Sequence, residues 1–337
     1  MKNTLKKLTP EPVIAWLRGA ESDLKLYHET MRQMRRFRRN YARRGTNGKT
    51  QVESRLIFFT HQIEKGLSHE HFRYGFGRTV LEQFAPLLKQ LKSMDPNVQA
   101  NPVWASAIDA LHEYRVKHER AGKDLSAVRA LFDPDIWNMI GEADGKRGGI
   151  LVIKSADKAD NASKTFRELS ESRHSLREFA DERVSAEEIM RCIDVAMRTP
   201  SVCNRQPTRV HVITNPDVIA KAMPLQGGYR GYAMPPALVL ITADNRAFMS
   251  QDERNEGFVD GGLFGMSLLL ALEEAGLAAC PLNTMLPAKR DDATRRLLHL
   301  LDSEFLVMYI AVGHFLPESK TCHSQRFTAS DIATVIA

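Results

Sequence analysis

Residues 172–177 read Ser-Arg-His-Ser-Leu-Arg and place Arg173, Ser175 and Arg177 at alternate positions. Two guanidinium groups with a hydroxyl between them can hold a phosphate through charge-assisted hydrogen bonds, which are about twice as strong as neutral ones. Taken alone, the hexapeptide fits an exposed basic turn at least as well, because arginine is common on protein surfaces. Its meaning therefore depends on the segments that accompany it along the chain.

Two more polar segments follow. Residues 199–207 read Thr-Pro-Ser-Val-Cys-Asn-Arg-Gln-Pro, in which Ser201, Asn204 and Gln206 can donate to or accept from a polar heterocycle, while the two prolines stiffen the loop. Residues 323–326 read His-Ser-Gln-Arg and again place an arginine close to a hydroxyl. Each of them, read singly, is no more than a turn, and only their combination suggests a site for an anionic, planar ligand.

The order and spacing of the three segments resemble the nitroreductase family, from about Thr165 to the end of the chain. In that family the first segment binds the phosphate and ribityl chain of FMN, the second reaches FMN from the partner subunit, and a strand after a long helix passes beside the flavin ring. The resemblance therefore implies a homodimeric FMN protein. The residues that it implies as cofactor contacts are Arg173, His174, Ser175, Arg177, Pro200, Ser201, Asn204, Gln206, Pro281, Leu282, Asn283, Ser324 and Arg326.

Some positions depart from the family pattern or stay open. Val202 stands where the family has a second serine, Thr208 replaces an aromatic residue, and the proline-rich tail is reduced to Pro317. Gln226 lies in a glycine-rich stretch before an expected strand and is a candidate contact to the flavin edge or the substrate. A solvent-exposed loop explains Gln226 and its neighbour Arg230 equally well.

The length of 337 residues allows two domains. Apolar residues at three- and four-residue spacing predict helices at 24–41, 52–65, 79–92 and 102–121. The four glycines of 141–149 predict a linker. We therefore expect a mainly helical N-terminal domain, 1–149, of unknown role.

The pattern changes in the C-terminal domain, which we place at 150–337. A capping box starts a helix at Ser185, and a long apolar helix spans 258–275. Short β-rich runs lie between helices. The expected fold is α+β, an α/β sandwich with a nitroreductase-like mixed sheet flanked by helices. The expected strands are 209–214, 237–242, 277–282 and 305–313.

Composition excludes several classes of protein. With 43% hydrophobic and 26% charged residues the chain is neither disordered nor fibrous. The apolar run 305–312 is too short for a bilayer span, and the basic start Met1 to Lys7 lacks the apolar run of a secretory signal. The four cysteines are too sparse for a disulfide framework and are expected to be free thiols. We therefore expect a cytoplasmic protein without a membrane partner.

The net charge of +6 includes a block of seven arginines and one lysine, without acids, at 31–50. Such a block can attract nucleic acid or anionic lipid, but a solvated basic helix face is the simpler interpretation. Few aromatic residues accompany the arginines and no nucleic-acid motif is present. We expect no nucleic-acid partner.

Between Thr60 and Gly77 the N-terminal part is dense in ionisable and aromatic groups. One hypothesis is a metal site made of His61, Glu64, His69 and His71, a ligand set that arises readily by chance, so that we expect no metal. A second is a wall or lid over the flavin, and a third is scaffold packing. The wall would use Phe58, Phe59, Phe72 and Phe76.

The resemblance implies an FMN-dependent oxidoreductase, reduced by NAD(P)H or another donor, that reduces a small nitro, quinone or related acceptor. A dedicated dehydrogenase or reductase of a biosynthetic pathway is an alternative within this class. An alternative of another class is a flavin-binding sensor or assembly protein without significant turnover. Fold alone does not choose among these functions, and the sequence identifies no catalytic acid or base.

Overall fold

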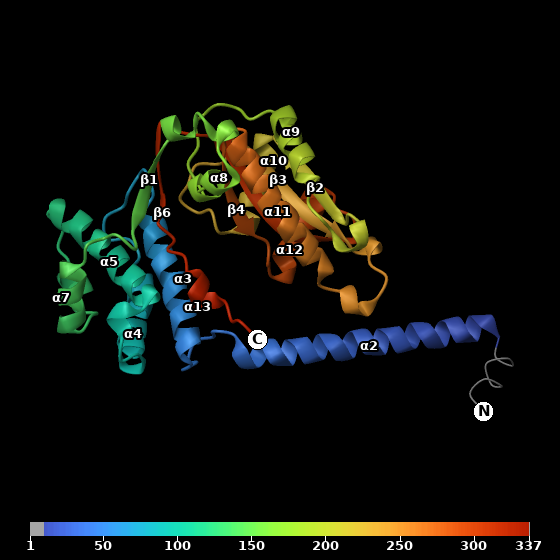
Figure 1. The fold of residues 1–337 in the computed structure, drawn as a ribbon, viewed down its shortest axis with the longest axis horizontal. Coiled ribbons are helices and arrows are strands. Elements are labelled where there is room, and N and C mark those ends of the chain that lie inside the picture. The colour runs from blue at the N-terminus through green and yellow to red at the C-terminus, as the bar shows by residue number, and fades with distance from the viewer. Residues whose placement is uncertain (1–9, 337) are drawn as a thin grey trace.

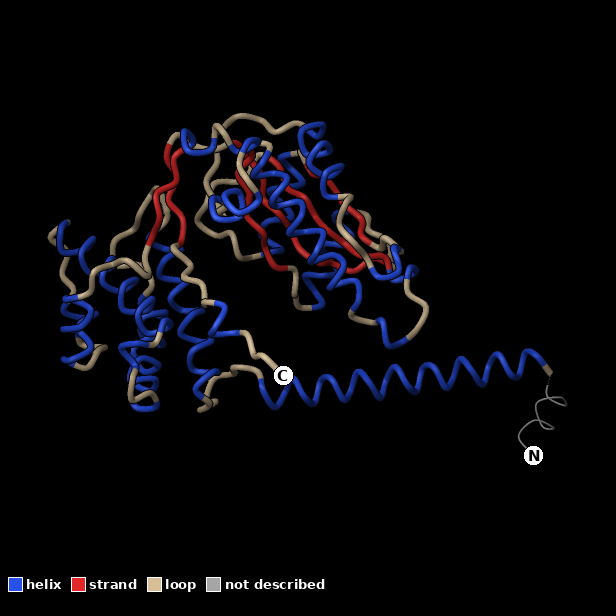
Figure 2. Tube along the Cα trace, viewed as in Figure 1, coloured by secondary structure: helices blue, strands red, loops and turns tan. Residues whose placement is uncertain are grey.

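The computed structural model describes residues 10–336, so that the basic start Met1 to Lys7 lies outside it. Figures 1 and 2 show a helical part built from the N-terminal residues beside a part that contains a sheet covered by helices. Each part has hydrophobic cores of its own. The boundary at residue 149 stays a prediction.

The helical part packs around one apolar core, in which Leu56, Phe84, Tyr114 and Ile136 are almost fully buried. Its main helices match the predicted ones closely, apart from the last, which the sequence analysis missed. They are α3 (Lys49–Leu67), α4 (Arg78–Met94), α5 (Pro102–Arg120) and α7 (Pro134–Glu142), with the short α6 (Ser126–Arg129) between the last two.

The helix α2 (Glu11–Asn40) stands apart from both cores. It begins well before the predicted start at residue 24 and contains no buried residue. Figure 1 shows it running from the base of α3 past the sheet-containing part. None of the described helices combines the length and the apolarity needed to cross a bilayer.

The second part is an α/β sandwich around a four-stranded antiparallel sheet in the order β2-β3-β5-β4. The predicted strands correspond to β2 (Thr208–Ile213), β3 (Ala237–Asp244), β4 (Leu277–Asn283) and β5 (Glu304–His314). Every residue of β3 is buried, because helices cover both faces of the sheet. One parallel bridge between Ser175 and Ala279 extends the β4 edge.

Two pairs of helices form the outer layers of the sandwich. One face packs against α9 (Ala186–Ala196) and α11 (Glu256–Glu274), which are the capped helix and the long apolar helix of the sequence analysis. The other face packs against α10 (Pro216–Gln226) and α12 (Ala288–Leu298). The short helix α8 (Phe166–Ser172) completes this part, whereas the short helix α13 (Ala329–Ile332) lies beside α3 of the helical part (Figure 1).

A separate two-stranded ladder joins the two parts. Strand β1 (Ile150–Lys154) pairs antiparallel with β6 (Glu318–Cys322), so that the chain beyond β5 returns to the helical part (Figure 1). Neither strand was predicted. β6 reads Glu-Ser-Lys-Thr-Cys and lacks an apolar pattern, whereas β1 reads Ile-Leu-Val-Ile-Lys, a β-rich run that the prediction overlooked. The ladder carries the third polar segment, 323–326, to the side of α3.

Candidate functional site

The first polar segment leaves α8 and lies along the free edge of β4. The Leu176 amide donates to the Ala279 carbonyl at 3.1 Å, and the bridge from Ser175 to the same strand holds the backbone extended. Side chains alternate along an extended segment, so Leu176 points into the core while its two odd-numbered neighbours point the other way. The local geometry thus orients Ser175 and Arg177 together.

Three guanidinium groups without salt bridges mark this edge. Arg173 lies 3.5 Å from the Ser175 hydroxyl, measured from Nη1, and Arg326 donates to the Ser324 carbonyl. Burial lowers the pKa of Arg173, and the nearby positive charge of Arg326 adds to the effect. Within residues 10–336, neither of these arginines nor Arg177 forms a salt bridge with a carboxylate. Arg173 and Arg177 are partly buried, whereas Arg326 is exposed. Partly buried cations without acidic partners are suited to an anionic ligand.

His174 belongs to a different environment. Its Nδ1 lies 2.7 Å from the carbonyl oxygen of Ser172, and burial lowers the pKa of the imidazole. It lies near a buried ion pair in which Lys158 Nζ is 2.6 Å from Glu273 Oε1. Alternation along the extended segment directs His174 to the side opposite Arg173 and Arg177, and a contact of His174 with the cofactor stays a prediction.

The ion pair behind the loop was missed by the sequence analysis. Lys158 and Glu273 are 5% and 2% exposed, and Lys158 also donates to the carbonyl of Ser172. Asn161 donates to the Glu273 carbonyl at 2.6 Å. These contacts attach the start of the polar segment to the end of α11. No local pattern could have revealed them, because the two charges are 115 residues apart in sequence.

The end of β4 meets the glycine-rich turn that follows α10. Gln226 donates to the Asn283 carbonyl at 3.1 Å and accepts from the Gly228 amide at 2.7 Å. Since its amide is used for these two contacts and its side chain is buried, Gln226 positions the turn rather than lying free in solvent. Tyr229 donates to the Arg177 carbonyl, which brings the turn beside the first polar segment. Arg230 is exposed.

One face of α3 packs against this site. His61 and Lys65 are four residues apart and share a side of α3, and His69 follows just beyond the end of the helix at Leu67. His61 Nε2 lies 3.5 Å from Arg177 Nη2, Lys65 donates to the Gly228 carbonyl, and His69 stacks on the Tyr232 ring at 3.8 Å between centroids. The helical part thus contributes a wall to the site.

The charges on this face are weakened by their surroundings. Burial lowers the pKa of His61 to about 4, with further contributions from the positive charges of Arg177 and Lys65. Burial also lowers the pKa of Lys65. His61 is therefore neutral at physiological pH, which is how an imidazole can lie next to a guanidinium group.

The phenylalanines proposed for this wall lie elsewhere. Phe72 and Phe76 pack against the core of the helical part, Phe59 is buried in that core, and Phe58 is 57% exposed. These four residues therefore do not form the wall, and a wall over the flavin made by α3 stays a prediction. The usable signal in the sequence was the four-residue repeat of basic side chains.

A metal does not fit the nearby cluster. His61, Glu64 and Cys322 have ligand atoms within 4.8 Å of one another. The Arg177 guanidinium already lies 3.8 Å from the Cys322 sulfur and 3.5 Å from His61, and this fixed positive charge would repel a second cation. His69 and His71, which the metal hypothesis included, are not part of the cluster. We assign no metal to it.

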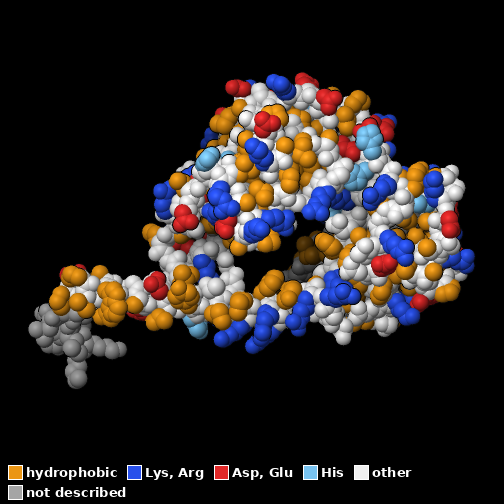
Figure 3. Space-filling model, turned by 180° about the vertical axis from the view of Figure 1, so that it is seen from behind, with side chains coloured by type: hydrophobic (Ala, Val, Ile, Leu, Met, Phe, Trp, Pro, Cys, Tyr) orange, Lys and Arg blue, Asp and Glu red, His pale blue; other side chains and the backbone are white. Residues whose placement is uncertain are grey.

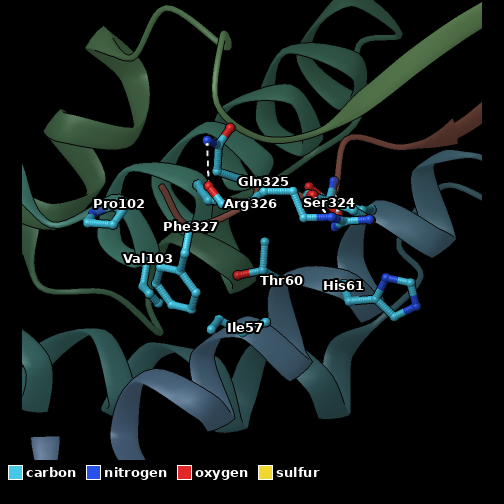
Figure 4. A pocket seen from close by; sticks show the side chains of 11 residues that line it. Ile57, Thr60, His61, Pro102, Val103, Ser324, Gln325, Arg326 and Phe327 are labelled. Atoms are coloured by element: carbon cyan, nitrogen blue, oxygen red, sulfur yellow. Dashed lines mark hydrogen bonds between the residues drawn. The ribbon is translucent and has the colours of Figure 1, made fainter. Parts of the chain in front are cut away.

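A pocket of about 290 Å³ opens between α3, α5 and residues 324–327 (Figure 4). Thr60, 5% exposed, has a hydroxyl without a hydrogen-bond partner among the described residues, and its side chain lies in the centre of this view. The Glu64 carboxylate accepts from the amides of Gly149 and Ser324, and burial raises its pKa to about 7. An unsatisfied buried hydroxyl beside Arg326 is consistent with a polar ligand.

The second polar segment lies at the opposite edge of the sheet. It leads directly into β2, which is separated from β4 by two strands, or roughly 14 Å at about 4.8 Å between neighbouring strands. The Val202 amide donates to Asp260, and Arg205 pairs with Glu253, so the loop is held firmly. Asn204 and Gln206 are exposed. A single chain does not bring the first two polar segments together.

Backbone strain is concentrated in the predicted segments. Five non-glycine residues of the described chain have positive φ angles, and only His299 lies outside these segments. The other four are Cys203, Asn204 and Gln206 in the second segment and Ser324, at +52°, in the third. Such conformations cost free energy and tend to persist where a ligand site requires them.

The comparisons with known proteins concern the sheet-containing part. A family model described as the nitroreductase family matches residues 171–228 and 226–314. No similar protein was found among the curated proteins.

Solved structures resemble about half of this chain. An NADH oxidase candidate from Clostridium acetobutylicum is 20% identical, with a TM-score of 0.43, and the match covers 49% of this chain and 97% of that one. An NAD(P)H:FMN oxidoreductase candidate from Staphylococcus epidermidis is 18% identical, with a TM-score of 0.46, and the match covers 51% of this chain and 96% of that one. An FMN-dependent nitroreductase from Clostridium difficile is 18% identical, with a TM-score of 0.40, and the match covers 49% of this chain and 92% of that one.

Proposed function

Residues 171–314 belong to the nitroreductase family, and from this premise we propose that the chain is an FMN-dependent oxidoreductase. It takes electrons from NADH or NADPH and passes them to a small organic acceptor, with nitro and quinone compounds as the default class. The four cysteines are free thiols, as expected of a protein in a reducing compartment, and we place the activity in the cytoplasm.

The observation that carries the proposal is the group of unpaired cations at the β4 edge. Arg173, Arg177 and Arg326 converge there from two distant segments, and within the described chain none has a carboxylate partner. A phosphate monoester with its double negative charge would satisfy them. The residues present therefore fit the phosphate end of FMN.

Each group then has a defined task. Arg173, Ser175 and Arg326 would hold the phosphate, while the Pro281–Asn283 segment and the turn fixed by Gln226 would lie at the ring. When bound, FMN supplies the hydride and electron transfer. The α3 wall limits the access of water and large acceptors, because Lys65 and His69 fasten it to the turn at 228–232.

We propose that the working unit is a homodimer with two shared sites. The strained loop at 201–206 is exposed and lies at the far edge of the sheet, so it can complete a site only on another copy. A two-fold symmetric pair would use each loop once.

The α3 wall favours a second candidate within the class, a reductase or dehydrogenase dedicated to one substrate. An added wall narrows the space beside the flavin and selects acceptors by shape. A strong preference for one acceptor over generic nitroaromatics and quinones would distinguish the dedicated enzyme from a broad reductase.

The test is the absorption spectrum of the purified chain, with the released flavin identified, before and after anaerobic NADH and NADPH. Bound FMN that bleaches with a nicotinamide and recovers with a quinone supports the proposal. FMN that no donor reduces would instead indicate a sensor or assembly protein. A folded chain that takes up no FMN overturns the proposal.

The matched variants are Arg173→Ala and Arg167→Ala. The first removes a charge-assisted contact to phosphate and should weaken FMN binding by about 10- to 100-fold, since such contacts contribute roughly 1.5–3 kcal/mol. Arg167 is exposed on α8, only six residues away, and its removal should leave the affinity unchanged. Equal affinities for the two variants, measured by fluorescence titration of the apoprotein, would contradict the assignment of Arg173.

A further inference from the structure

The helix α2 has no buried residue over 30 positions. Helices in proteins derive most of their stability from packing an apolar face, and an isolated helix in water is marginal. Figure 3 shows orange apolar side chains along α2. Within the described residues, nothing covers this face.

Seven apolar residues of α2, from Val13 to Met34, follow one another in alternating four- and three-residue steps. This is the heptad spacing of a coiled coil, sustained over about three heptads. Leu24 and Tyr27, at the middle of the series, are 70% and 69% exposed. We call the series the α2 seam, and it consists of Val13, Leu17, Ala20, Leu24, Tyr27, Met31 and Met34.

The rest of the chain holds α2 by its opposite side. Ser22 donates to Gln251 at 3.4 Å, and Gln33 accepts from Arg254 at 3.2 Å. Both α2 residues occupy outer heptad positions, away from the seam. The α2 seam is therefore presented outward by contacts that keep the helix in place.

The charges along α2 favour one orientation for a partner helix. Residues 11–30 contain four acids and two bases, whereas residues 31–40 contain five arginines and no acid. A parallel pair of α2 helices would place ten arginines together. An antiparallel pair with Leu17 opposite Met34 places residues 32–39 beside residues 12–19 of the other helix, which carry only Arg18, so the repulsion between like charges is much smaller.

The side chains also fit one antiparallel register. Leu17 would pack against Met34 of the second copy, and Leu24 against Tyr27 of the second copy. The same register places Trp16, 70% exposed, opposite Phe37 of the second copy, 66% exposed, at the positions that flank the seam. The two aromatic residues of α2 outside the seam, Trp16 and Phe37, are thus brought together by the same register that pairs the seam residues.

We propose that α2 is a self-association helix, whose seam pairs antiparallel with α2 of a second copy of this chain. This interface is separate from the proposed flavin sites and does not depend on them. It also gives the arginine block a task, because the arginines specify the antiparallel orientation.

Disulfide trapping tests the register. In a Cys203→Ser background, which removes the only exposed cysteine of the described chain, Leu17→Cys and Met34→Cys chains of different mass are mixed and oxidised. The mixed disulfide should dominate, because two copies of residue 17 would lie about 25 Å apart in this register. Predominant 17-to-17 product would mean a parallel pair and would overturn the proposal, as would the absence of any cross-linked product.

Light scattering with a matched pair of variants tests the interface itself. Leu24→Glu places a charge in the seam, and Leu26→Glu makes the same change at an outer position, two residues away. The first should weaken association at least tenfold, and the second should leave the molar mass as it is. Because the proposed flavin-site dimer can hold two chains together by itself, the yield of the 17-to-34 disulfide is measured in both variants as well, and equal yields would refute the seam. FMN content, read from the absorption of the same samples, reports on the flavin site independently.

Discussion

At the residue scale, His61 and Glu64 lie on one turn of α3, and their pKa values are shifted in opposite directions. The folded chain holds the pKa of His61 at about 4, below its ordinary 6.5, and that of Glu64 at about 7, above its ordinary 4.5. As the pH rises from 4.5 to 6.5, unfolded His61 still binds a proton that the folded chain lacks, which raises stability. Over the same pH range, Glu64 in the folded chain keeps a proton that it has lost in the unfolded chain, which lowers the stability.

We therefore expect the two contributions to cancel in the unaltered chain and to separate in variants. In Glu64→Gln the free energy of unfolding should rise from pH 4.5 to 6.5, and in His61→Gln it should fall from pH 4.5 to 7. Each change is at most about 3 kcal/mol for shifts of this size. Urea unfolding across this range measures both slopes. If the two variants show the same slope, the assigned shifts are wrong.

At the scale of elements, the Lys158–Glu273 pair attaches α11 to the polar segment at 172–177. Lys158→Met should cost about 3–5 kcal/mol, because it leaves the Glu273 carboxylate buried without its partner. The variant should also bind FMN more weakly, since Lys158 holds the Ser172 carbonyl next to Arg173. Denaturant unfolding and flavin titration measure the two effects.

The double variant Lys158→Met with Glu273→Met supplies the control. Removing both charges should recover much of the lost stability, because no isolated charge stays buried. An exposed pair, Arg78 with Glu82, should lose less than about 1 kcal/mol in Arg78→Ala. A Lys158→Met chain as stable as the unaltered one would show that the ion pair is not formed in solution.

At the scale of the whole molecule, a site shared between copies can be rebuilt from two defective chains. Arg173→Ala damages one half of the proposed site, and Asn204→Ala with Gln206→Ala damages the other. In a mixed dimer one site receives both intact halves and the second receives neither. Random mixing should therefore restore about a quarter of the full-affinity FMN sites.

Flavin titration of mixtures, prepared by co-refolding, measures this recovery. Mixing Arg173→Ala with Arg177→Ala is the matched control, because both changes fall on the same half and no intact site can form. Recovery in neither mixture would mean that each chain builds its site alone. That result would contradict the shared site inferred from the two segments at opposite edges of the sheet.

Much of the fold was accessible from local patterns. The capping box at Ser185 and Glu188 predicted the start of α9, and the β-rich run at 237–242 predicted the strand β3. The alternation of Arg173, Ser175 and Arg177 sufficed to place Ser175 and Arg177 on one side. Such features depend on neighbours within one turn or one strand, which sequence order supplies directly.

What only the tertiary structure decided involves partners far apart in the chain. The β1–β6 ladder, the contact of His61 with Arg177, and the burial of Lys158 against Glu273 join residues more than 100 positions apart. The sequence alone does not distinguish a buried charged side chain from a solvated one, because burial depends on distant chain segments that folding places around it. The sequence therefore determined which groups could bind an anionic cofactor, and the fold determined which of them share an edge.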